Sequence, residues 1–121
     1  MDAPTPQNIL DVDQVSQQLK IRPHIYVKLV KSFAESLPQK LNSFNDALMS
    51  NDRDQMRMIL HEIKGTAGNL RLNTIIGPET VLHTAVKAGG APDILLKHFD
   101  ILKTESERLL QYIGKIDMPA S

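Results

Sequence analysis

Residues 53–70 read RDQMRMILHEIKGTAGNL, and this stretch decides the fold class of the chain. Its apolar residues recur at steps of three and four, which is the spacing of one face of an α-helix. On a helical wheel of about 100° per residue they occupy a single arc, which must face a core. The residues of this arc are Met56, Ile59, Leu60, Ile63, Ala67 and Leu70. The segment therefore predicts an amphipathic helix, and Asp52 is placed to cap its first turn.

The same periodicity continues on both sides of this segment. Further helices are expected at residues 12–19, 23–50, 74–88 and 92–114. Pro38 falls inside the second of these without a change of phase, which predicts a kink or a junction of two collinear helices. Pro78 is expected in the first turn of its helix or just inside a helix that starts later, and Gly89-Gly90 is a stop signal. Four substantial helices with short connections predict an all-α fold: an antiparallel four-helix bundle with a short additional N-terminal helix.

The 121 residues fit one domain, expected over residues 9–116, with loose ends at 1–8 and 117–121. Lys plus Arg and Asp plus Glu are balanced at 14 each, which argues against a nucleic-acid binder. Cysteine is absent, so disulfides and thiolate chemistry are excluded, in keeping with a reducing cytoplasm. No apolar run approaches the roughly 20 residues that span a bilayer. We therefore expect a cytoplasmic chain with no direct membrane contact of its own, either free-standing or the cytoplasmic part of a membrane-bound protein, and a monomer by default.

His61 is the candidate for chemistry, because it points away from the apolar arc of its helix. Lys64, Gly65 and Gly68 follow it at +3, +4 and +7 and so share its exposed stripe. Each glycine costs about 1 kcal/mol inside a helix relative to alanine, and a surface stripe gains nothing structural from it. Two such glycines make sense if another molecule must approach His61 closely. A neutral imidazole is a competent nucleophile, and the Lys64 ammonium can neutralise a phosphoryl group placed on it.

The pattern His61-x-x-Lys64-Gly65, followed by Gly68, resembles the histidine-containing phosphotransfer (HPt) domain of two-component signalling. The resemblance extends over nearly the whole chain. Its other parts are Ile9-Leu10-Asp11 as the lead-in, Phe33-x-x-x-Leu37-Pro38 in the second helix, and Gly89-Gly90 as the closing turn.

This resemblance implies that His61 accepts a phosphoryl group and that Lys64 supports the phosphorylated state. It implies that Gly65 and Gly68 leave room for the partner, the receiver domain of a response regulator or of a hybrid histidine kinase. No cofactor is implied for the chain itself, since Mg²⁺ belongs to the acidic pocket of the receiver. It also implies a relay without kinase activity, and the sequence has no phosphate-binding Gly-rich loop.

Four neighbouring residues are further candidates for partner binding. Arg71 stands where the family often has a small residue, and it is expected to narrow partner choice or to contact the receiver. His83 stands where the family often has Gln or Glu, and either it hydrogen-bonds His61 or it is an ordinary polar surface residue. Met58 and Leu72 are apolar residues near the His61 stripe, which suits a transient interface. The alternative for this pair is partial burial under the N-terminal helix.

Two other classes of function compete with the phosphorelay. A helical adaptor that binds another helix explains the bundle but not Gly65 and Gly68. A metal-dependent bundle enzyme needs Glu-x-x-His pairs on facing helices, and the sequence has none. Only the spacing of Glu79 and His83 hints at metal ligands.

Overall fold

The computed structural model describes residues 10–116, so the loose ends expected at 1–8 and 117–121 lie outside the described residues. The described chain forms helices joined by short turns and contains no strand. The helices are α2 (Val12–Leu19), α3 (Pro23–Met49), α4 (Arg53–Asn69), α5 (Asn73–Lys87) and α6 (Pro92–Lys115). The predicted all-α fold is confirmed, and the expected helix limits agree within a residue or two.

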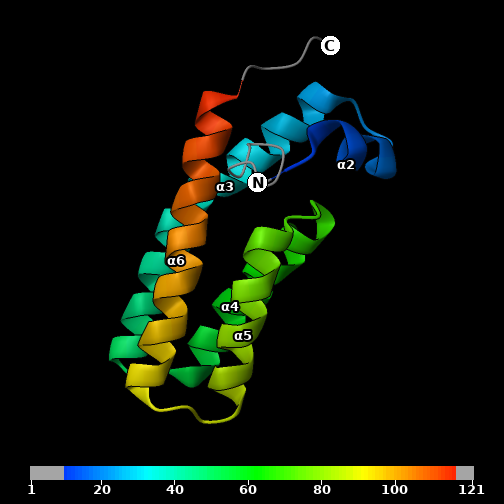
Figure 1. Ribbon diagram of the computed structural model, residues 1–121. Coiled ribbons are helices and arrows are strands. Elements are labelled where there is room, and N and C mark those ends of the chain that lie inside the picture. The colour runs from blue at the N-terminus through cyan, green and yellow to red at the C-terminus, as the bar shows by residue number, and fades with distance from the viewer. Residues whose placement is uncertain (1–9, 117–121) are drawn as a thin grey trace, which may run out of the picture.

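Four helices make the bundle, and α2 lies against the N-terminal end of α3 (Figure 1). Each bundle helix packs on the next along the chain, and α6 closes the bundle by packing along α3. Successive helices run antiparallel because the turns between them are short. Asp11 and Asp52 cap α2 and α4 through their side chains, as Asp52 was expected to do. Pro23 and Pro92 occupy the first positions of α3 and α6.

Two prolines, Pro38 and Pro78, lie inside helices. α3 is one continuous helix with Pro38 inside it, so the alternative of two collinear helices is wrong. α5 begins at Asn73, which places Pro78 in the second turn instead of the first. Because Pro78 has no N–H, the carbonyl of Thr74 lacks its usual helical donor. The earlier start follows from the preceding residue, Leu72, which is buried and fixes the entry into α5.

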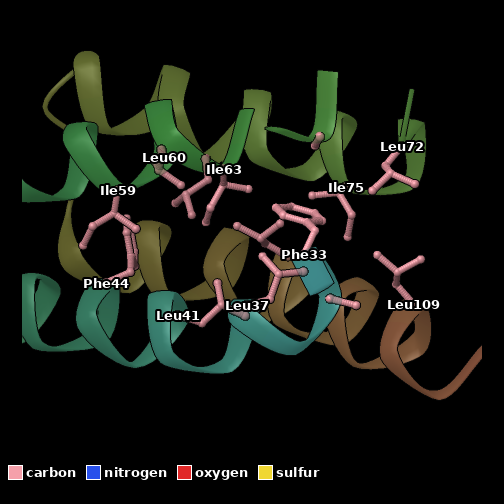
Figure 2. Close-up of a cluster of buried hydrophobic side chains, with 14 of the residues drawn as sticks. Phe33, Leu37, Leu41, Phe44, Ile59, Leu60, Ile63, Leu72, Ile75 and Leu109 are labelled. Carbon is pink, nitrogen blue, oxygen red and sulfur yellow. The ribbon is translucent and has the colours of Figure 1, made fainter. Parts of the chain in front are cut away.

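The core lies between the four long helices, and Figure 2 shows side chains of α3 meeting those of α4, α5 and α6. Every residue of the arc predicted for α4 is buried. Phe44 of α3 and Phe99 of α6 stack with their ring centroids 5.0 Å apart. The rest of this core is almost wholly aliphatic, in keeping with the few aromatic residues of the chain. One face of α4 is therefore held rigidly, and its opposite face is left to solvent.

A buried hydrogen bond fixes the turn between α4 and α5. The Tyr26 hydroxyl of α3 donates to the carbonyl oxygen of Leu70 at 2.6 Å. Arg71 follows with a φ of 61°, in the left-handed region, and the Leu72 N–H donates to the Ala67 carbonyl at 2.9 Å. This geometry ends α4 and reverses the chain. Burial raises the pKa of Tyr26 well above its ordinary value of 10.0, an effect that the nearby Arg71 partly offsets.

Replacing Tyr26 with phenylalanine should lower the free energy of unfolding by about 1–2 kcal/mol, because the buried Leu70 carbonyl loses its donor. Urea unfolding followed by circular dichroism measures this change. Because folding raises the pKa of Tyr26, the stability that its neutral hydroxyl contributes is fully present below pH 10 and falls as the pH rises above it. The phenylalanine variant has no hydroxyl to ionise at position 26. Its free energy of unfolding should therefore fall less above pH 10 than that of the wild type. An unchanged urea midpoint would show that the hydrogen bond contributes nothing.

Candidate functional site

His61 lies in the middle of α4 and its side chain is exposed. Two nearby apolar residues of the same helix, Leu60 and Ile63, hold this orientation because both are completely buried. The helix cannot rotate His61 inward without lifting both of these side chains out of the core. The imidazole is thus presented to solvent on a rigid support, as the helical wheel predicts.

Gly65 and Gly68 lie on the same outer surface of α4. A β-carbon at either position would meet no neighbouring heavy atom within 4 Å, so packing does not require a glycine there. The same is true of Gly77 and Gly114, so open space alone does not mark a site. What distinguishes Gly65 and Gly68 is their position one and two turns from His61. Together they leave a low, smooth surface beside the imidazole.

Lys64 is exposed one turn after His61. No ion-pair partner holds its side chain within the described part of the chain. A flexible lysine without a partner can move its ammonium to an anion that arrives at the neighbouring residue. His61 and Lys64 are therefore both exposed and lie one turn apart on α4, as the spacing predicts.

The two predicted apolar contacts have different outcomes. Met58 is 57% exposed, one turn before His61, and is free to meet a partner. Leu72 is 1% exposed and belongs to the core, so its assignment to a partner surface is wrong. Leu72 follows the left-handed residue Arg71, which turns the chain back toward the bundle and carries Leu72 inward.

The structure adds two apolar residues that the sequence did not single out. Ile25 and Leu29 lie one turn apart on α3 and are 38% and 46% exposed. Leu29 borders a surface groove of about 400 Å³, whose α4 wall includes Thr66 and Asn69. This groove therefore lies beside the C-terminal end of α4. The signal in the sequence was weak, because Leu29 lies on α3 and borders this groove beside α4 only in the fold.

Arg71 and His83 make contacts other than those expected. Nη1 of Arg71 donates to the Gly68 carbonyl at 2.9 Å, so the guanidinium caps the end of α4. Nδ1 of His83 lies 3.0 Å from Oε2 of Glu79, and no hydrogen bond joins His83 to His61 among the described residues. The expected His83–His61 bond is therefore absent from this structure, and His83 pairs with its own helix. The Arg71 side chain is exposed at the C-terminal end of α4, so it is accessible to a partner.

Residues 10–116 contain no group of three His, Asp or Glu side chains arranged to hold a metal ion. The Glu79–His83 spacing is thus accounted for by a hydrogen bond.

None of the described helices is long and apolar enough to cross a membrane.

The comparison with protein families places the chain in a known family. A model of the family described as Hpt domain matches residues 28–112, which include His61 and its whole stripe. The chain therefore belongs to the Hpt domain family. Members of this family act as phosphotransfer intermediates in two-component signalling and interact with receiver domains. No curated protein and no solved structure matches the chain.

Proposed function

We propose that this chain is a phosphorelay intermediate that carries the phosphoryl group on His61. It takes the group from the phosphoaspartate of a receiver domain and passes it to the aspartate of a response regulator. The observation that carries this proposal is the exposed His61 on a rigid helix, with Lys64 and two glycines on the same surface. We further propose that the chain works as a monomer in the cytoplasm and has no kinase activity of its own.

The transfer needs a free imidazole nitrogen and an open line of approach. The nitrogen lone pair of neutral His61 attacks phosphorus, and the bond between phosphorus and the aspartate oxygen breaks with its electrons going to the carboxylate. The phosphoryl group then sits on nitrogen, and the reverse reaction delivers it to the next aspartate. Such transfers depend on positioning and on charge neutralisation. In this scheme, Mg²⁺ in the receiver's pocket and the Lys64 ammonium supply the positive charge that neutralises the phosphoryl oxygens.

The partner surface that we propose is centred on His61 and has apolar edges. Met58 lies one turn before His61 on α4. Leu29 of α3, with Ile25 one turn before it, borders the groove that Thr66 and Asn69 of α4 also line. Exposed apolar side chains near a reactive residue are typical of a surface that binds a protein partner. A helical adaptor is the alternative function, but it still gives no reason for glycines beside an exposed histidine.

The test is transfer from receiver domains charged with acetyl phosphate, using a panel from the genome that encodes this chain. The proposal expects at least one receiver to lose its phosphoryl group when the chain is added, and the chain to gain it. A receiver that lacks its phosphoacceptor aspartate is the control and should transfer nothing. If no receiver of a complete panel transfers a phosphoryl group, the relay proposal is wrong.

Replacing Lys64 with alanine should lower the equilibrium ratio of phosphorylated chain to phosphorylated receiver by roughly tenfold. A hydrogen bond to a charged group contributes about 1.5–3 kcal/mol, and partial exposure reduces this value. The ratio is measured with radiolabelled phosphate after the reaction has reached equilibrium. Lys97→Ala on the exposed surface of α6 is the matched control and should leave the ratio unchanged. Equal ratios for Lys64→Ala and wild type would remove Lys64 from the mechanism.

A further inference from the structure

Arg71 occupies a backbone position that does not suit a large side chain. It follows α4 with a φ of 61°, in the left-handed region, where a β-carbon is crowded and glycine is favoured. Its N–H donates to the Gly68 carbonyl at 3.1 Å, and the next N–H donates to the Ala67 carbonyl at 2.9 Å. The end of α5 has the same two bonds, with Gly89 at the corresponding position. Arg71 therefore makes its turn less stable than glycine would.

The core holds the backbone on both sides of Arg71. The Tyr26 hydroxyl donates to the carbonyl of Leu70 at 2.6 Å, and Leu72 is 1% exposed. Nη1 of Arg71 donates to the Gly68 carbonyl at 2.9 Å, which fixes the side chain as well. Burial is the larger influence on the pKa of Tyr26, and the charge of Arg71 lowers that pKa, which agrees with a guanidinium close to the turn. The guanidinium is thus anchored at the end of α4.

The anchored guanidinium still has unused donors. A guanidinium carries five N–H groups, and the bond to Gly68 uses one of them. Arg57 and Arg108 each pair with a carboxylate of their own helix, whereas no carboxylate lies within ion-pair distance of Arg71 in residues 10–116. A planar guanidinium matches a carboxylate through two parallel hydrogen bonds. Since Arg71 is exposed, a carboxylate of another molecule can reach an oriented, unpaired cation here.

This guanidinium lies inside the area that a partner of His61 would cover. Gly68, to which it is bound, is seven residues after His61 on the same stripe, or about 10 Å along the helix. A protein interface of standard size buries about 800 Å² on each partner, which is a disc of about 16 Å in radius. A partner centred on His61 therefore reaches the guanidinium. At that distance the guanidinium meets the body of the partner and not the phosphoryl group.

We propose that Arg71 binds a carboxylate side chain of the receiver domain, at the edge of the surface that meets His61. This inference rests on the proposed function, since it takes the partner to be a receiver. The contact selects among receivers, because those with Asp or Glu at the facing position bind more tightly than those with a neutral or basic residue there. Such a role accounts for an arginine at a position where glycine would give a more stable turn.

The first test removes the charge of Arg71 and keeps its backbone conformation. Arg71→Gln should raise the dissociation constant for the receiver that phosphorylates the wild type by about three- to tenfold, since a charged hydrogen bond at an exposed site is lost. Arg71→Lys keeps the charge without the planar fork and should recover part of this loss. Lys87→Gln, at the exposed last residue of α5, is the matched control and should bind like the wild type. Isothermal titration measures the four constants.

A double-mutant cycle identifies the counterpart on the receiver. Each surface carboxylate of the receiver is replaced in turn by the corresponding amide. Loss of the counterpart should weaken binding to the wild-type chain by about the same three- to tenfold, and it should have no further effect on binding to Arg71→Gln. If every carboxylate affects both chains equally, Arg71 has no carboxylate counterpart and the inference is wrong.

Arg71→Gly distinguishes this role from a structural one. Glycine relieves the left-handed backbone, so the melting temperature should rise by about 2–5 °C. Receiver binding should nevertheless weaken as much as in Arg71→Gln. A lower melting temperature with unchanged binding would overturn the inference, as would a wild-type dissociation constant in Arg71→Gln. In either case the proposed function stands if the wild type exchanges phosphoryl groups with a receiver. If no receiver does so, the proposed function fails and this inference fails with it.

Discussion

Replacing His61 with glutamine will abolish phosphoryl transfer to the chain while leaving its fold intact. Glutamine keeps a polar side chain of similar length, but its amide nitrogen has no lone pair available for attack on phosphorus. The loss should be at least about a thousandfold, as expected when a nucleophile is removed. Transfer of radiolabel from a charged receiver measures it.

Because His61 is exposed, the substitution should change the free energy of unfolding by no more than about 0.5 kcal/mol. His98→Gln on α6 is the matched control and should accept label at the wild-type rate. If the His61 variant retains even a tenth of the wild-type rate, another residue is the phosphoacceptor.

Replacing Gly68 with leucine is the second large effect that we expect, and it separates function from stability. No heavy atom lies within 4 Å of the position that its β-carbon would take, so the side chain has room. Removing a glycine from a helix should stabilise the fold by up to about 1 kcal/mol. The same side chain stands where a receiver must approach. Since a misplacement of about 1 Å can cost 10²-fold in rate, transfer should slow by roughly 10²-fold.

Gly114→Leu is the control for this experiment. Gly114 is the next-to-last residue of α6, as Gly68 is of α4, and its β-carbon position is equally open. The control should gain similar stability and transfer at the wild-type rate. Stopped-flow or quenched transfer assays, paired with thermal unfolding, give both quantities. If Gly68→Leu transfers as fast as Gly114→Leu, the glycines of α4 do not serve partner approach.

The helices were predictable from the sequence because each carries its own signals. Pro23, Pro92 and Gly89-Gly90 mark ends, and the apolar steps of three and four hold their phase through each helix. The exposure of His61 follows from that phase alone. The wheel failed at Leu72, because it was extended past the end of α4. There the left-handed backbone of Arg71 breaks the periodicity and sends Leu72 into the core.

The rest of the candidate site depends on contacts between helices. Leu29 adjoins Thr66 and Asn69 only because α3 packs on α4, and no local pattern contains that information. The spacing of Glu79 and His83 was visible, yet nothing in the sequence indicated that Glu79 is buried, since a glutamate is rarely found in a core. In the structure Glu79 is buried and its Oε2 lies 3.0 Å from Nδ1 of His83, so a hydrogen bond accounts for the spacing.

Peptide mapping tests directly whether the phosphoryl group resides on His61. Trypsin cleaves after Arg57 and Lys64, so residues 58–64 form a peptide with a single histidine, and each other histidine falls in a different peptide. After transfer from a charged receiver, mass spectrometry at neutral or alkaline pH should find the added phosphoryl group on the peptide 58–64. A phosphoryl group found on another peptide, with 58–64 unmodified, would contradict the account.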